Sequence, residues 1–231
     1  MLTVSNLDVS ISGSRILRGV SVEVPPHSVV CLMGRNGVGK TTTLKTIVGL
    51  LKPDAGAVSL LGEDLTRKPP EKRASRGLGY VPQGREIFPH LTVRENLEIG
   101  AIAQGKALNG NLDRVFTLFP ILADFLARKG GMLSGGQQQQ LAIARVLLTE
   151  PKVLILDEPT EGIQPNIIDQ IGETIRLLRS EGKMSILLVE QYLDFAKDLA
   201  DLFYIMDRGA IVVHGPIAEL SESLVREHLT V

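Results

Sequence analysis

Apolar and polar residues alternate in short runs over the first 33 residues of the chain, and small residues or prolines separate the runs. Alternating apolar positions occur over 7–11 and 20–24, and residues 29–33 form an unbroken apolar run of strand length. A period of two is the pattern of a strand with one buried face. We therefore expect an antiparallel β layer that leads into a further strand at 29–33.

Beyond residue 40 the pattern switches between helical spacing and short apolar runs. Helices are predicted over 42–50, 112–119, 121–126, 138–148, 167–180 and 193–200, with a short one near the end from residue 217. Strands are predicted over 58–61, 78–81, 153–156, 185–189, 203–206 and 211–213. Strands that alternate with helices indicate an α/β fold with a mainly parallel core.

One long helical stretch, from residue 92 to about residue 148, is inserted into this alternation. Thr92 and Glu95 have the spacing of a capping box at its start. Residues 52–56 and 105–111 carry the glycine, proline and asparagine typical of turns and loops. Residues 207–210 are expected to form the turn of a hairpin.

Composition narrows the class of protein. The 231 residues suffice for one large domain or two small ones, and 44% hydrophobic with 22% charged residues is ordinary for a globular protein. A net charge of -1 offers no bulk attraction for nucleic acid or anionic lipid. The single cysteine, Cys31, is expected in the core of a protein from a reducing compartment. We see no secretion signal and no bilayer-spanning run, so another chain would have to hold the protein at a membrane.

The segment Gly34-Arg35-Asn36-Gly37-Val38-Gly39-Lys40-Thr41-Thr42 fits the phosphate-binding pattern G-x-x-x-x-G-K-[ST]. It lies between a predicted strand and a predicted helix, which is the context that the pattern requires. Glycines let backbone N–H groups surround phosphate oxygens, and the helix start adds partial positive charge. Lys40 can reach the β- and γ-phosphates of a nucleotide, and the Thr41 hydroxyl can bind Mg²⁺.

Two carboxylates end the apolar run 153–156. Because parallel strands deliver their carboxyl ends to the ligand crevice, Asp157 can hold Mg²⁺ there and Glu158 can act as general base toward water. Gln83 follows another predicted strand, and its amide can contact both Mg²⁺ and water. Leu133-Ser134-Gly135-Gly136-Gln137 precedes a helix that Ser134 can cap, and its bare glycines form a second phosphate site at the helix start.

These motifs resemble those of the ATP-binding cassette ATPase family over nearly the whole chain, in the order Gly34–Thr41, Gln83, Leu133–Gln137 and Asp157–Glu158. The resemblance implies a P-loop NTPase (RecA-like) core with an N-terminal antiparallel β layer, at about 1–84 and 150–231, and an inserted helical subdomain at about 85–149. It implies ATP and Mg²⁺, and head-to-tail dimers in which each ATP lies between one chain's phosphate loop and the other's Ser-Gly-Gly segment. The implied nucleotide contacts are Ile11, Gly34, Arg35, Asn36, Gly37, Val38, Gly39, Lys40, Thr41, Thr42, Gln83, Ser134, Gly135, Gly136 and Gln137. The implied metal contacts are Thr41, Gln83 and Asp157, and the implied catalytic residues are Glu158, Lys40 and Gln191.

Finer similarities favour one group of importers. Residues 82–89 and Val189-Glu190-Gln191 are similar to ATPase subunits of bacterial branched-chain amino-acid importers, and residues 135–140 and 158–165 look most like the urea-importing branch. This resemblance implies a second ATPase subunit in a heterodimer, or a homodimer, together with transmembrane permease subunits and an external solute-binding protein. It places the chain on the cytoplasmic face of the inner membrane, held there by its partners, with no nucleic acid. Residues 92–125, with Phe88 and Leu91, are the expected docking face for a permease subunit.

Three positions depart from the family pattern. Ile11 stands 23 residues before Gly34, where an aromatic residue usually stacks on adenine. Gln191 replaces the usual histidine and Gln164 the usual aspartate, so neither can carry a proton or a charge. These glutamines leave open the alternative that the chain is a regulatory nucleotide-binding subunit that hydrolyses little ATP itself. The presence of Glu158, a candidate general base, argues against that alternative. A soluble cassette ATPase acting on nucleic acid or ribosomes is the other alternative, and the acidic balance of charge disfavours it.

Overall fold

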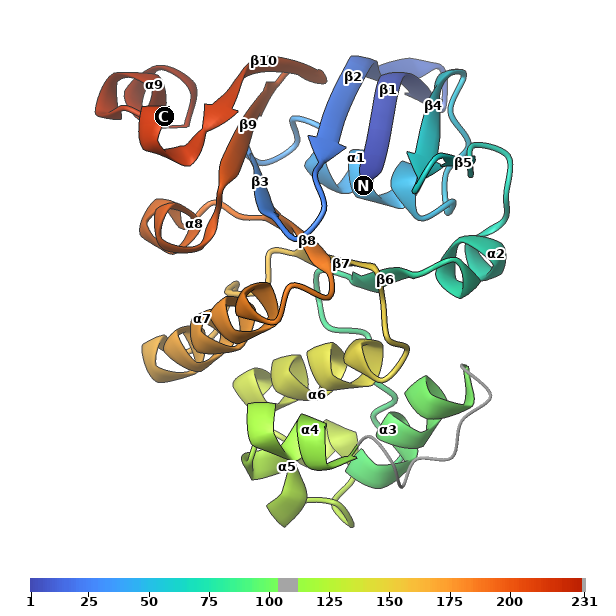
Figure 1. The fold of residues 1–231 in the computed structure, drawn as a ribbon, viewed down its shortest axis with the longest axis vertical. Coiled ribbons are helices and arrows are strands. Elements are labelled where there is room, and N and C mark those ends of the chain that lie inside the picture. Colours follow the sequence, from blue (N-terminus) through green and yellow to red (C-terminus); the bar gives the residue numbers. More distant parts are fainter. Residues whose placement is uncertain (104–111, 230–231) are drawn as a thin grey trace.

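Two β-sheets and a block of helices make up the protein, with the larger sheet between the smaller sheet and the helices (Figure 1). The computed structural model describes residues 1–103 and 112–229. The strands are β1 (Leu2–Ile11), β2 (Ser14–Val24), β3 (Val29–Met33), β4 (Ala55–Leu60), β5 (Glu63–Asp64), β6 (Leu78–Val81), β7 (Val153–Asp157), β8 (Ser185–Val189), β9 (Leu202–Asp207) and β10 (Ala210–Pro216). The helices are α1 (Lys40–Ile47), α2 (Pro70–Ser75), α3 (Val93–Ile102), α4 (Leu112–Leu118), α5 (Ile121–Asp124), α6 (Gly135–Leu147), α7 (Pro165–Ser180), α8 (Leu193–Leu199) and α9 (Glu222–His228), with 3₁₀ turns at Gly130–Met132 and Ile217–Glu219.

The smaller sheet has the strand order β2-β1-β4-β5 and is antiparallel, as the alternating pattern predicts. Val20, Val22 and Val24 point from β2 into the core, and the residues between them are exposed. One face of this sheet therefore packs on the rest of the molecule while the other meets solvent.

The larger sheet has the order β10-β9-β3-β8-β7-β6, in which only β10 runs antiparallel to its neighbour. Both faces of its central strands are buried. In β3, Cys31 and Met33 face the core shared with the helices, whereas Val30 and Leu32 face the core under the smaller sheet. This two-sided burial explains why β3, β7 and β8 read as unbroken apolar runs.

The strand order brings three loops together. Because β8 lies between β3 and β7, and all three strands are parallel, the segments after them meet at one edge of the sheet. Those segments are the glycine-rich loop 34–39, the pair Glu190–Gln191 and the residue Glu158. The site described below lies at this edge.

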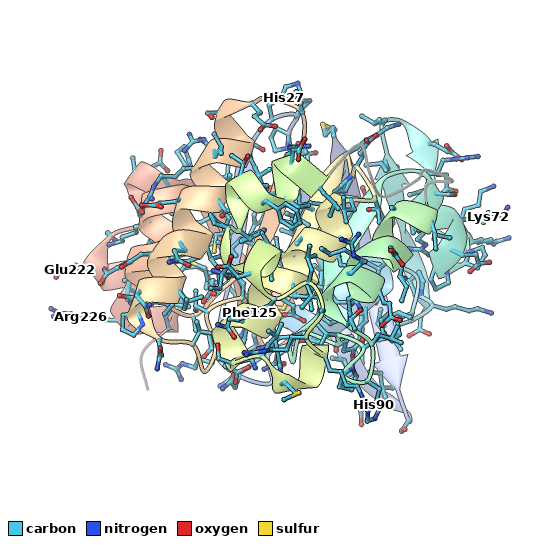
Figure 2. All side chains as sticks on the ribbon, turned by 90° about the horizontal axis from the view of Figure 1, so that it is seen from below. His27, Lys72, His90, Phe125, Glu222 and Arg226 are labelled. Atoms are coloured by element: carbon cyan, nitrogen blue, oxygen red, sulfur yellow. The ribbon has the colours of Figure 1, made fainter. Side chains whose placement is uncertain are left out.

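Helices α3 to α6 form the block between β6 and β7, at the bottom of Figure 1. The predicted capping box is confirmed: Thr92 accepts a hydrogen bond from the Glu95 N–H, and the Glu95 carboxylate accepts one from the Thr92 N–H. Figure 2 views the molecule from the side of this block, with Phe125 near its middle, and the guanidinium of Arg128 covers the Phe125 ring at 4.3 Å. The division at residues 84/85 and 149/150 stays a prediction.

Several predicted boundaries are wrong. Helix α1 begins at Lys40 rather than at residue 42, and α6 begins at Gly135 rather than at residue 138, because both helices start directly on their glycine-rich segments. Gly56 was expected in a turn but lies in β4. Leu61 was expected in a strand but forms a two-residue turn with Gly62, both with positive φ, as the tight hairpin to β5 requires. The loop predicted at 105–111 lies outside the described residues.

Most other predicted helices and strands are found within a few residues of their expected ends. Within residues 1–103 and 112–229, no helix has the length and apolar character that a membrane crossing requires.

Candidate functional site

Lys40 occupies the centre of the glycine-rich loop. Its ammonium donates hydrogen bonds to the backbone carbonyls of Gly34 at 2.7 Å and Arg35 at 3.0 Å, and the side chain is only 5% exposed. Gly39, the residue before α1, has φ 116°, a backbone conformation that L side chains rarely adopt. The loop therefore curls around a buried positive charge at the start of α1.

A cavity of about 500 Å³ opens over this loop. Its lining includes most of the predicted nucleotide contacts, and Ser14 and Ile16 from β2 are added to them. Residues on the lining are Ile11, Ser14, Ile16, Asn36, Gly37, Gly39, Lys40, Thr41, Thr42, Gln83 and Glu158. Gly34, Arg35 and Val38 do not line the cavity. Ile11, 40% exposed at its edge, offers an aliphatic surface where an aromatic ring is usual in the family that the sequence resembles.

Asp157 ends β7 with its side chain 1% exposed. The Tyr80 hydroxyl donates to Oδ2 at 3.2 Å, whereas Oδ1 has no hydrogen-bond partner among the described residues. Burial raises the pKa of Asp157, and the hydrogen bond from Tyr80 opposes that rise. A buried carboxylate oxygen without a donor is costly unless a cation meets it.

This orphaned oxygen fits Mg²⁺, which prefers oxygen ligands and takes few of them from protein. The Thr41 hydroxyl is near enough to lower the pKa of the same carboxylate, which places two of the predicted oxygen ligands close together. The described residues hold no group of three or more histidine, cysteine or acidic side chains placed to bind a metal. A magnesium ion here would therefore complete its shell with phosphate oxygens and water.

Glu158 is the meeting point of three side chains. Its Oε1 accepts a hydrogen bond of 2.7 Å from the Gln191 amide and lies 3.4 Å from the Lys40 ammonium. The Gln83 amide donates to Glu158 Oε2 at 3.3 Å and to Glu161 Oε2 at 2.9 Å. The amide N–H groups of Gln83 are thus directed to these two carboxylates, and its predicted contact with the metal through the amide oxygen stays a prediction.

The Ser134 segment lies at a different cavity from the Lys40 loop. Ser134 caps α6 in a reciprocal box with Gln137, as its sequence predicts. Ser134 to Gln137 line a second cavity of about 500 Å³ together with Gly162, Gln164 and α7. None of the residues lining this cavity lines the cavity over Lys40. One chain thus presents two separate half-sites.

Sequence reasoning missed several residues that organise the site. Tyr80 orients Asp157 from the neighbouring strand β6, and Glu161 competes with Glu158 for Gln83. Buried Glu190 accepts from the N–H of Gln191 at 3.0 Å and from the Thr160 hydroxyl at 2.8 Å, which joins the segments after β8 and β7. A carboxylate directly after an apolar strand was the available signal for Glu190.

Comparisons with known proteins agree with this geometry. The family described as ABC transporter matches residues 17–161. The chain is 40% identical over 221 residues to the high-affinity branched-chain amino acid transport ATP-binding protein BraG of Pseudomonas aeruginosa, which covers 95% of this chain and 94% of BraG. It is 38% identical to the probable branched-chain amino acid transport ATP-binding protein LivF of Archaeoglobus fulgidus, covering 96% and 94%. Among solved structures, the ADP conformation of MJ1267, an ATP-binding cassette of an ABC transporter, superposes with a TM-score of 0.82 at 31% identity over 98% of this chain and 97% of MJ1267.

Proposed function

Because the chain belongs to the ABC transporter ATPase family, whose members hydrolyse ATP, we propose that it powers a bacterial solute importer. Its α/β fold is that of the P-loop NTPases. The observation that carries the proposal is the meeting of Lys40, Glu158 and Gln191 at the edge of one ATP-sized cavity.

Each side chain has a part in the proposed reaction. The backbone of the loop and the Lys40 ammonium bind the phosphates, and Lys40 stabilises the negative charge that develops on them. Glu158 orients the attacking water and takes up its proton, while Gln191 holds the Glu158 carboxylate beside Asn36. Mg²⁺, held by Asp157, Thr41 and the amide oxygen of Gln83, would neutralise phosphate charge when bound.

The two half-sites support a head-to-tail pair. The phosphate loop and the Ser134 segment line different cavities of one chain, so one ATP cannot touch both within it. Two chains arranged head to tail, either two copies or this chain with a second cassette ATPase, would form two composite sites. Each site would combine the phosphate loop of one chain with the Ser134 segment, or its equivalent, of the other. Each ATP would then be held between Lys40 of one chain and the start of α6 of the other.

The solution mass of the Glu158→Gln variant, with and without Mg²⁺-ATP, tests this function. Slowed hydrolysis should let ATP hold two chains together, so the mass should double on adding Mg²⁺-ATP and return to the monomer value with ADP. Lys40→Ala in the same background is the control, because removing the ammonium should abolish ATP binding and the mass change. A Glu158→Gln chain that does not bind ATP would contradict the proposal.

The transported solute is the finer part of the proposal. The resemblance of residues 135–140 and 158–165 to the urea-importing branch favours urea, whereas the names of BraG and LivF favour a branched-chain amino acid. Uptake of labelled urea and of labelled leucine, measured in host cells with and without the gene, separates the two. Loss of urea uptake alone would support urea, and loss of leucine uptake alone would overturn it.

The membrane partners belong to the same proposal. We infer that permease subunits bind the block α3–α6 and keep the chain at the cytoplasmic face of the inner membrane, with an external solute-binding protein completing the system. Phe88, Ile99 and Ile102 are exposed apolar side chains at this block, which supports a docking role. Copurification with membranes that lack these partners would contradict it.

A regulatory subunit with little hydrolysis is the second candidate, favoured by one observation. Gln191 holds the Glu158 carboxylate with an amide, which cannot exchange a proton as a histidine could. A chain that dimerises with ATP but hydrolyses none, even when its companion subunits are present, would establish that candidate in place of the first.

A further inference from the structure

Arg85, two residues after Gln83, reaches across to the start of α6. Its Nη1 lies 2.9 Å from the position that a Cβ on Gly135 would take, so the guanidinium lies directly against the first residue of α6. Its Nη2 donates to the carbonyl oxygen of Glu161 at 3.4 Å, a long hydrogen bond, and lies near Gly162. The guanidinium therefore sits beside the cavity of the Ser134 segment, which Gly135 and Gly162 line.

The backbone at this point is held in an unusual conformation. Gly84, Arg85 and Glu86 have φ values of 82°, 73° and 46°, which places three consecutive residues in the left-handed region. Such conformations are unfavourable for residues with a side chain and cluster where function requires them. The strained turn aims the Arg85 side chain at α6 rather than into solvent.

The electrostatics of the arrangement are unbalanced. The start of a helix carries partial positive charge, and a guanidinium beside it adds a charge of the same sign. Among the described residues Arg85 makes no ion pair, and the N–H groups of Gly135 and Gly136 have no acceptor there. An anion against Gly135 and Gly136 would satisfy the bare N–H groups and the guanidinium together.

Gln140 provides a separate indication of a ligand. Its side chain is 1% exposed, lines the same cavity, and has an Oε1 atom without a hydrogen-bond partner. Its Nε2 donates to Gln170 at 2.7 Å, which fixes the amide. Gln140 is five residues along α6 from Gly135, roughly 8 Å at the rise of an α-helix. A ligand with an anionic group at one end and hydroxyl donors at the other, such as a nucleotide, matches both ends of the cavity.

We propose that Arg85 is a nucleotide-binding residue that acts across the dimer: its guanidinium contacts the terminal phosphates of the ATP held by the phosphate loop of a second copy of this chain. The inference rests on the proposed function, because it needs the head-to-tail pair. Arg85 contributes nothing to binding of ATP by its own Lys40 loop, since its side chain lies at the other cavity.

The test compares ATP-driven dimerisation with ATP binding by the monomer, in the Glu158→Gln background. Sedimentation at increasing Mg²⁺-ATP gives the concentration for half-maximal dimer, and a fluorescent ATP analogue at low protein concentration gives the affinity of the monomer. Arg85→Gln should raise the half-maximal ATP concentration about tenfold, the worth of one charge-assisted hydrogen bond. Arg85→Lys, which keeps the charge but not the planar fork, should raise it by about threefold. Arg67→Gln, which removes an exposed charge from the loop before α2, should leave it unchanged.

The outcomes separate this inference from the function on which it rests. A raised half-maximal concentration with unchanged monomer affinity supports the role of Arg85. Equal half-maximal concentrations for Arg85→Gln and its background overturn it, and so does an Arg85→Gln chain whose monomer also loses ATP. A background chain that binds ATP but stays monomeric overturns it too, because no second copy then meets Arg85, while the ATPase proposal stands. A Glu158→Gln chain that binds no ATP would overturn both the role of Arg85 and the ATPase proposal.

Discussion

Gln191 donates a hydrogen bond of 2.7 Å to Oε1 of Glu158, and the same amide donates one of equal length to Oδ1 of Asn36. These two bonds join the segments that follow β3, β8 and β7, three strands that lie side by side in that order in the sheet. The amide thus fixes the carboxylate of the proposed general base relative to the phosphate loop. An amide does this without ionising, so the contact is the same at any physiological pH.

Replacing Gln191 by histidine should make hydrolysis depend on pH in a new way. An imidazole titrates near pH 6.5, so the ratio of the Gln191→His rate to the unmodified rate should change between about pH 6 and pH 8. Gln191→Ala, which removes both donated hydrogen bonds, should lower kcat about tenfold at every pH in that range. Steady-state ATPase rates across the range check both expectations. A Gln191→His rate equal to the unmodified rate at every pH would remove the idea that Gln191 limits this site.

Asp157 should make the folded protein less stable at neutral pH than its amide counterpart. Because burial raises the pKa of Asp157 above that of an exposed aspartate, the folded state keeps this proton to higher pH than the unfolded chain does. Stability therefore falls as pH rises from about 4 through the raised pKa, and the buried charge persists as a cost above it. Asp157→Asn should raise Tm by about 2–4 °C at pH 7 in EDTA, with ATP hydrolysis lost.

Thermal unfolding of Asp157→Asn at several pH values provides the internal control. The gain in Tm should shrink as pH is lowered and disappear below about pH 4, where the native carboxyl is protonated in both states. A variant that is less stable than the native chain at pH 7 would show that the negative charge of Asp157 is already compensated without Mg²⁺.

The local parts of the site could be predicted from sequence, and the contacts between them could not. The phosphate loop, the carboxylates after β7 and the cap at Ser134 are each encoded by neighbouring residues, so a motif and its flanking pattern suffice. The contact of Gln191 with both Asn36 and Glu158 depends on β8 lying between β3 and β7. Strand order is set by packing between distant segments, and hydrophobic periodicity does not encode it.

The same distinction explains Tyr80 and Leu61. Tyr80 belongs to a strand that the pattern predicts, but its hydrogen bond to Asp157 arises only because β6 pairs in parallel with β7. Leu61 extends an apolar run, so periodicity assigns it to the strand. In the structure the strand ends at Leu60, and Leu61 adopts a positive φ in the turn to β5. A hydrophobic side chain in a tight turn violates the usual turn chemistry, and only the pairing of Leu60 with Glu63 reveals it.

Removing the Tyr80 hydroxyl should weaken the use of Mg²⁺. Tyr80→Phe deletes the hydrogen bond that orients the Asp157 carboxylate, and loss of such a supporting contact typically lowers metal affinity about tenfold. The Mg²⁺ concentration for half-maximal ATPase activity should rise accordingly. Tyr204→Phe is the matched control, because it deletes a hydrogen bond from the Glu23 N–H in a part of the sheet away from Asp157. Equal Mg²⁺ requirements for the two variants would contradict the role given to Tyr80.

Arg73 should be a main support of the helix that carries Lys40. Its side chain is 2% exposed, and its guanidinium donates at 2.7–2.8 Å to four backbone carbonyls, those of Thr46, Ile47, Thr66 and Lys68. Two of these carbonyls end α1, where a positive charge is favourable. Burial lowers the pKa of Arg73, yet the guanidinium stays charged at neutral pH because an arginine gives up its proton only in strong base.

Arg73→Met keeps most of the apolar stem and deletes the guanidinium, which removes a donor from four backbone carbonyls, two of them in buried hydrogen bonds. The free energy of unfolding should fall by about 3 kcal/mol, equivalent to a drop in Tm of about 6–12 °C. Lys72→Ala is the control from the same helix, because Lys72 projects into solvent at the edge of the molecule (Figure 2) and should change Tm by less than about 1 °C. At temperatures where Arg73→Met is still folded, ATP binding should persist, since the guanidinium holds the far end of α1 and Lys40 its beginning. Equal thermal stability of the two variants would mean that water replaces the guanidinium without cost.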